Sequence, residues 1–108
     1  MPAFTLTNKA KADLKEIGQY TQAQWGRNQR NKYLTMLDAC FRQLAANPLN
    51  GKDCSDIRNG YRKLNVGSHV IFYRQAHADS IEIVRVLNGR MDIEMQLSVP
   101  KNPVIQFV

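Results

Sequence analysis

A chain of 108 residues has the length of one domain with a single core of moderate extent, and a hydrophobic content of 44% excludes a disordered protein. Its longest apolar runs span a few residues, and its first residues lack the basic-then-apolar order of a signal peptide. We therefore expect one domain over residues 1–108 in the cytoplasm, without membrane contact. The formal net charge of +6 favours a nucleic acid or an acidic protein as partner.

The N-terminal part predicts a strand and then a helix. Residues 3–7 place Phe4 and Leu6 on one face and carry threonines, which suit a strand. Apolar positions then recur at helical spacing (Ala10, Leu14, Ile17 and Thr21). Thr7 or Asn8 is the expected cap, and Gly26 can close the helix in the left-handed conformation.

A second helix follows, with a cap expected on Asn28 and a stripe of Tyr33, Leu37, Cys40 and Leu44, widened by Met36 and Phe41. Asn47-Pro48 ends it, because proline disfavours a helical conformation in the residue before it. The short connection predicts an antiparallel helical hairpin, and we expect Trp25 to cover it rather than to stack on a base.

After a polar loop at 50–60, three strand patterns come in a row: 61–66, 69–75 and 80–87, separated by turns at 67–68 and 77–79. The middle one is apolar on both faces, so we expect it to be central. The order β-α-α-β-β-β predicts a two-layer α+β domain, with the helical hairpin packed on a mainly antiparallel sheet. A short helical stretch through Leu97 and an extended, apolar tail from about residue 98 are expected at the C-terminus.

Cysteine and histidine usage predicts no metal site and no cofactor. Cys40 and Cys54 form no Cys-x-x-Cys pair, and the chain has only two histidines. Two reduced cysteines are the simplest interpretation.

One segment of the chain resembles the ParE toxins of the RelE/ParE superfamily of bacterial toxin–antitoxin modules. It reads GYRKLNVGSHVIFYRQ from Gly60, and IEIVRVLNGRMD follows from Ile81. The resemblance runs from about Phe4 to Asp92. It implies two helices on an antiparallel sheet, a neutralising ParD-like antitoxin that binds DNA through a ribbon-helix-helix fold, and poisoning of DNA gyrase. Operator DNA would be contacted only through the antitoxin. The resemblance also implies that the module serves plasmid maintenance or a stress response.

The alternative is a messenger-RNA endonuclease of the RelE branch, and a third possibility is a module that has lost its toxicity. RNA cleavage needs a base, an acid and cations around the phosphorane. By comparison with that branch, an arginine position falls on Val70, and no Tyr or His follows Arg90 to act as the late acid. We therefore expect no enzyme activity and no catalytic residue.

His69 has two possible places, because residues of one parity along a strand share a face. If Val70 and Phe72 face the helices, His69 and Tyr73 lie on the open face. If Ile71 and Tyr73 face inward, His69 is half-buried at the start of a strand and structural, which is the interpretation we favour. Tyr61 and Tyr73 are expected to fill the core or its edge.

The candidate target-binding residues are cations and their neighbours on the C-terminal strands: Arg62, Lys63, His69, Arg85, Arg90, Met91 and Asp92. Arg62 and Lys63 are equally well explained as solvated side chains. Met91 and Asp92 fit either a helix cap or a target contact. The sequence does not indicate the antitoxin-binding surface.

Overall fold

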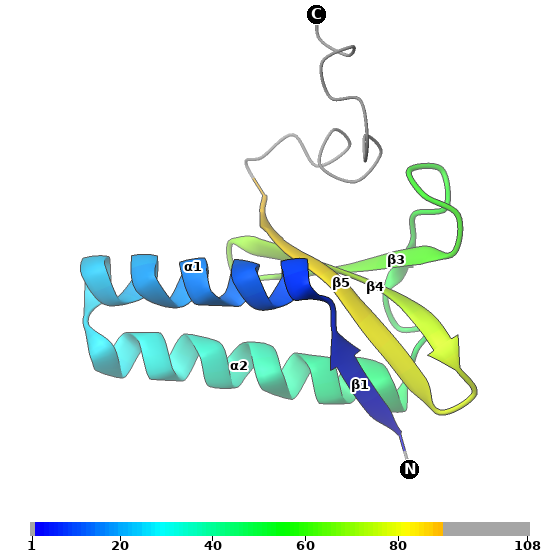
Figure 1. The fold of residues 1–108 in the computed structure, drawn as a ribbon, viewed down its shortest axis with the longest axis horizontal. Helices are drawn as coiled ribbons and strands as arrows, with labels where there is room; N and C mark the ends of the chain where they lie inside the picture. Colours follow the sequence, from blue (N-terminus) through cyan, green and yellow to red (C-terminus); the bar gives the residue numbers. More distant parts are fainter. Residues whose placement is uncertain (1, 90–108) are drawn as a thin grey trace, which may run out of the picture.

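The computed structural model describes residues 2–89, which form a helical hairpin packed on a five-stranded sheet (Figure 1). The elements are β1 (Ala3–Leu6), α1 (Asn8–Trp25), α2 (Arg27–Ala46), β2 (Lys52–Asp53), β3 (Tyr61–Val66), β4 (His69–His77) and β5 (Ser80–Asn88). The strand order is β1-β5-β4-β3-β2. β1 runs parallel to β5 and the other pairs are antiparallel. The predicted α+β fold is confirmed; the stretch through Leu97 and the tail lie outside the described residues.

The two helices follow one another without a linker. The Thr7 hydroxyl caps α1 by accepting a bond from the amide of Ala10 at 3.0 Å, and it donates to the carbonyl of Val84 at 2.8 Å. Gly26 closes α1 at a φ of 92°, a conformation that favours glycine, and α2 begins at the next residue. The predicted cap on Asn28 is therefore wrong, because the chain reverses within a single residue. Among the described residues, neither helix is long and apolar enough to cross a bilayer.

The main core lies between the helices and one face of the sheet. Ile71 and Tyr73 of β4 are buried there against Leu37, Phe41 and Leu44 of α2. The orientation in which Ile71 and Tyr73 face inward is thus confirmed.

A second apolar cluster packs separately from the main core. It consists of Cys54, Val70, Phe72 and Leu87, with Ile57 and Tyr61 at its edge. Val70 and Phe72 alternate with Ile71 and Tyr73, so this cluster occupies the face of β4 that points away from the helices. The loop between β2 and β3 covers it. β4 is the middle strand and buries side chains on both faces, as its sequence predicts.

The segment between α2 and β3 is tied to the core by the phenol of Tyr73. This hydroxyl donates to the carbonyl of Pro48 at 2.7 Å and accepts a bond from the amide of Gly51 at 2.8 Å. Arg62 donates to the carbonyl of Gly51 at 2.7 Å. The segment was expected to be a loop throughout, but β2 pairs within it through Lys52 with Lys63 and Asp53 with Arg62. These contacts from distant residues convert part of a polar loop into an edge strand.

Candidate functional site

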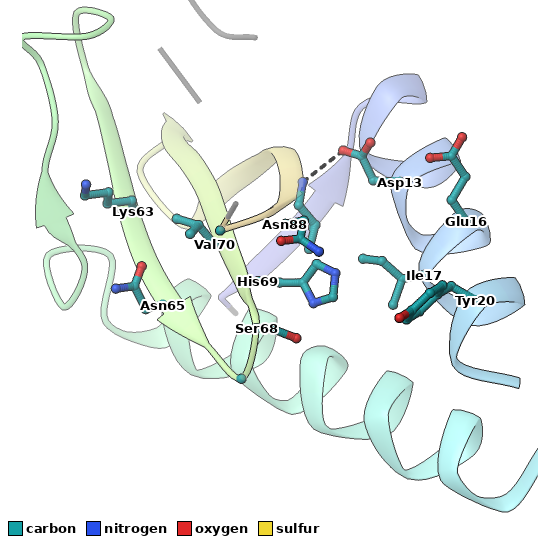
Figure 2. Close-up of a pocket in the computed structure, with 13 residues that line it drawn as sticks. Asp13, Glu16, Ile17, Tyr20, Lys63, Asn65, Ser68, His69, Val70 and Asn88 are labelled. Carbon is teal, nitrogen blue, oxygen red and sulfur yellow. Dashed lines mark hydrogen bonds between the residues drawn. The ribbon is translucent and has the colours of Figure 1, made fainter. Parts of the chain in front are cut away.

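A groove with a volume of about 790 Å³ lies between α1, the β3–β4 turn and the end of β5. Figure 2 shows His69 facing Ile17 and Tyr20 of α1, with Asn88 of β5 beside it. Asp13 and Glu16 lie further along α1, and Lys63 and Asn65 line the far side. No cluster of three or more His, Cys, Asp or Glu side chains suited to a metal ion occurs within residues 2–89.

His69 is a structural member of this groove. Its Nδ1 atom lies 2.6 Å from the Tyr33 hydroxyl, and the two rings lie 5.5 Å apart. Burial lowers the pKa of His69 below its ordinary value, and the negative charge of Asp13 partly opposes that shift. The imidazole is therefore neutral at neutral pH, half-buried and hydrogen-bonded at the start of β4. This is the placement that we favoured.

Stability should decrease on acidification partly because of His69. The folded-state pKa lies below the unfolded value of 6.5, so the unfolded chain takes up the proton first as the pH falls. The contribution is fully present above about pH 7 and is lost as the pH falls towards the folded-state pKa. Urea unfolding at about pH 7.5 and about pH 5.5 should show a smaller pH dependence for His69→Gln than for the wild type. His77→Gln, at an exposed position, is the matched control. An unchanged pH dependence in His69→Gln would contradict this assignment.

Arg85 forms a mostly buried ion pair with Asp13 of α1. Its guanidinium donates two bonds of 2.8 Å to the carboxylate, which also accepts the amide of Val86 at 2.9 Å. The two side chains are 16% and 10% exposed. The bond to Asp13 raises the pKa of Arg85, whereas burial lowers it.

The candidate target-binding residue Arg85 is therefore mostly buried and paired, and is not an exposed charge. β1 ends at Leu6 and pairs with β5 only as far as Ile83. Beyond Ile83, no strand within residues 2–89 pairs with this edge of β5. The Asp13 carboxylate fills this position and attracts the arginine.

The remaining candidates are not gathered into one cluster. Arg62 is half-buried and bonded to Gly51, which contradicts its interpretation as a solvated side chain. Lys63 pairs with Phe72, so it lies on the face of the sheet opposite the helices, whereas His69 points towards them. Figure 2 shows the two side chains directed away from each other. Arg90, Met91 and Asp92 lie outside the described residues, and their role stays a prediction.

Two aromatic residues of α1 are exposed to solvent, which the sequence does not predict. Trp25 is 71% exposed, which contradicts its expected role as a cover for the hairpin, and Tyr20 is 64% exposed. Both line a second cleft, of about 500 Å³, together with Tyr33, Ser68 and His69. Tyr20 lies outside the apolar stripe of α1, and this position in the sequence could have indicated that its side chain is exposed.

A family described as the ParE toxin of the type II toxin–antitoxin system parDE matches residues 4–93. This chain belongs to the ParE toxin family. Toxin ParE1 of Mycobacterium tuberculosis (strain H37Rv) is 44% identical over 87% of this chain and 96% of its own length. Toxin ParE1 of Caulobacter vibrioides is 37% identical, with 90% and 99% covered. Toxin ParE of Escherichia coli is 32% identical, with 91% and 95% covered.

A solved structure supports the same fold. A chain of the chromosomal ParDE system from P. aeruginosa superposes with a TM-score of 0.68 at 23% identity, over 82% of this chain and 96% of that one. The predicted ParE family is thus confirmed, and the protein is a toxin of a type II toxin–antitoxin system.

Proposed function

We propose that this ParE toxin poisons DNA gyrase by binding to it, without catalysis of its own, and that a ParD-like antitoxin neutralises it. The family supports the toxin assignment. The candidate residues with acid, base or cationic side chains do not lie together in one cluster, and this observation supports binding rather than catalysis. The toxin acts in the cytoplasm, where its target holds DNA.

The groove is poorly suited to RNA cleavage. A general base must lie within hydrogen-bond reach of its proton, and cations must surround the reacting phosphate. His69 is engaged by Tyr33, and Lys63 points to the other face of the sheet. The side chain of Val70 at the neighbouring position is 8% exposed and belongs to the second apolar cluster. The positions of these three side chains indicate that the hairpin of β3 and β4 stabilises the fold rather than forming a catalytic site.

We predict that the purified toxin leaves RNA intact, both free in solution and on translating ribosomes. Primer extension along a messenger RNA would map any cut. Site-specific cuts that disappear in Lys63→Ala would contradict the binding proposal and support the RelE-type endonuclease instead.

The proposed target is tested with purified gyrase and relaxed plasmid DNA. Supercoiling should be inhibited by the toxin and restored when the protein encoded by the neighbouring gene is added. Arg90→Ala, or truncation after Leu97, should reduce inhibition while the melting temperature and antitoxin binding are retained. Arg42→Ala is the matched control, because Arg42 is an exposed cation that pairs with Asp38 of its own helix. Full supercoiling at saturating toxin would refute the proposal.

The net charge of the chain supports an acidic antitoxin segment. Arg90 and Lys101 are balanced by Asp92 and Glu94, so residues 1–89 carry the whole +6. An acidic segment that folds on the toxin would complement this charge. We expect the affinity of the complex to fall as salt concentration rises, which calorimetry at two ionic strengths would measure. A salt-independent affinity would contradict this prediction.

A further inference from the structure

The tip of the helical hairpin, defined here as Tyr20–Tyr33, is rich in cations and amides and contains no acidic residue. Its cations are Arg27, Arg30 and Lys32, and its side-chain amides come from Gln22, Gln24, Asn28, Gln29 and Asn31. All but one of these eight residues are exposed, the exception being Arg30, which is half-buried. Basic residues interleaved with aromatic residues are typical of nucleic-acid-binding surfaces.

The charges of the hairpin tip are not neutralised within the described part of the chain. Arg30 donates to the side-chain oxygens of Gln22 and Asn31, which are uncharged. Arg42, Arg74 and Arg85 elsewhere each pair with a carboxylate. Arg27 and Arg30 also occupy the first turn of α2, where the helix dipole disfavours positive charge. The positive charges of the hairpin tip therefore reduce the stability of α2.

The hairpin tip also presents aromatic faces to solvent. Trp25 and Tyr20 are 71% and 64% exposed, and they border the cleft of about 500 Å³ that Tyr33 and Gln29 also line. This volume lies in the range of about 300–1,000 Å³ that is usual for small-molecule sites. The acidic residues of the adjoining groove are Asp13, which is paired with Arg85, and Glu16.

We propose that the hairpin tip binds single-stranded nucleic acid, with a base stacked on Trp25 and the flanking phosphates held by Arg27, Arg30 and Lys32. A single strand is favoured over a duplex because stacking needs a base whose face is free. The use of this contact on DNA held by gyrase rests on the proposed function, whereas the binding itself does not.

Trp25 is the only tryptophan of the chain, so its fluorescence reports on this site alone. Titration of the purified toxin with a short oligothymidylate should quench the emission to saturation. With three phosphate contacts, the logarithm of the affinity should fall with the logarithm of salt concentration at a slope of about −2. Duplex DNA of the same length should bind more weakly and quench less.

Variants locate the contact. Trp25→Ala, followed by anisotropy of a labelled oligonucleotide, should weaken binding by about tenfold, the size of one stacking interaction. Arg27→Gln should reduce the salt slope by about 0.7. Arg42→Gln removes the same charge near the other end of α2 and should leave both quantities unchanged. Unchanged melting temperatures would show that each variant is folded.

Several outcomes would overturn the inference: no quenching, equal loss of binding in Arg42→Gln, equal binding of duplex DNA, or equal quenching by a polyglutamate peptide. The last would identify an acidic protein as the partner. Supercoiling inhibition is measured on the same preparations. A toxin that inhibits gyrase but leaves the oligonucleotide unbound refutes this inference and keeps the proposed function. Binding without inhibition refutes the proposed function and keeps the inference.

Discussion

Replacing Gly51 with alanine is expected to destabilise the toxin by about 3 kcal/mol, the upper end of the usual cost of overpacking. A Cβ atom at this position would lie 2.4 Å from the Tyr73 hydroxyl, 2.7 Å from its ring and 2.9 Å from the carbonyl of Lys63. Tyr73 is 1% exposed and fixed by two hydrogen bonds, so it has little room to move. Relief of the clash would displace the phenol and release the segment between α2 and β3.

Urea unfolding of Gly51→Ala and of the wild type measures this difference directly. Gly89→Ala is the matched control, because within residues 2–89 its Cβ atom would meet only the carbonyl of Ser68, at an ordinary distance of 3.6 Å. We expect a change within about 0.5 kcal/mol for the control. Equal stabilities of the two variants would contradict the role assigned to Gly51 and Tyr73.

Replacing Asp13 with alanine should cost about 3 kcal/mol or more, as expected when one partner of a buried ion pair is removed. The change leaves the largely buried Arg85 guanidinium and the amide of Val86 without their acceptor. It also separates α1 from the part of β5 that lies beyond the end of β1. The affected free energy is that of global unfolding, because these contacts join the two layers.

Asp38→Ala is the control for this prediction. Asp38 pairs with Arg42 on the surface of α2, where the two side chains are 48% and 71% exposed, and such pairs contribute about 0–1 kcal/mol. Thermal unfolding should show a decrease of roughly 4–8 °C for each kcal/mol lost in Asp13→Ala and little change in Asp38→Ala. A small effect in both variants would show that the Asp13–Arg85 pair does not join the layers.

The sequence predicts the fold well because its local patterns agree with one another. Alternation in β3, the apolar run in β4, helical spacing in α1 and α2, and Asn47-Pro48 after α2 each indicate one local structure. β2 is too short and polar to give a pattern. It exists because Lys63 and Arg62 of β3 pair with it, and two polar residues give no alternation that predicts this pairing.

The site is less predictable, because the environment of a charged side chain depends on distant residues. Arg85 has the pattern of a solvated strand residue, and only the early end of β1 together with Asp13 explains its burial. Trp25 was expected to cover the helical hairpin, but its position at the last turn of α1 leaves it in solvent. Strand parity predicts that His69 shares a face with Ile71, but the sequence only favours the orientation in which this face packs on the helices. The burial of Ile71 in the main core decides between the two orientations.

The proposal of a gyrase poison is tested most directly by the covalent gyrase–DNA complex. Toxin, gyrase, plasmid DNA and ATP are incubated, the enzyme is denatured with detergent and digested, and linear plasmid is quantified on a gel. We predict that linear plasmid accumulates with toxin concentration, requires gyrase, and disappears when the antitoxin is added first. Intact plasmid with normal supercoiling, together with site-specific cleavage of messenger RNA by the same preparation, would contradict the account.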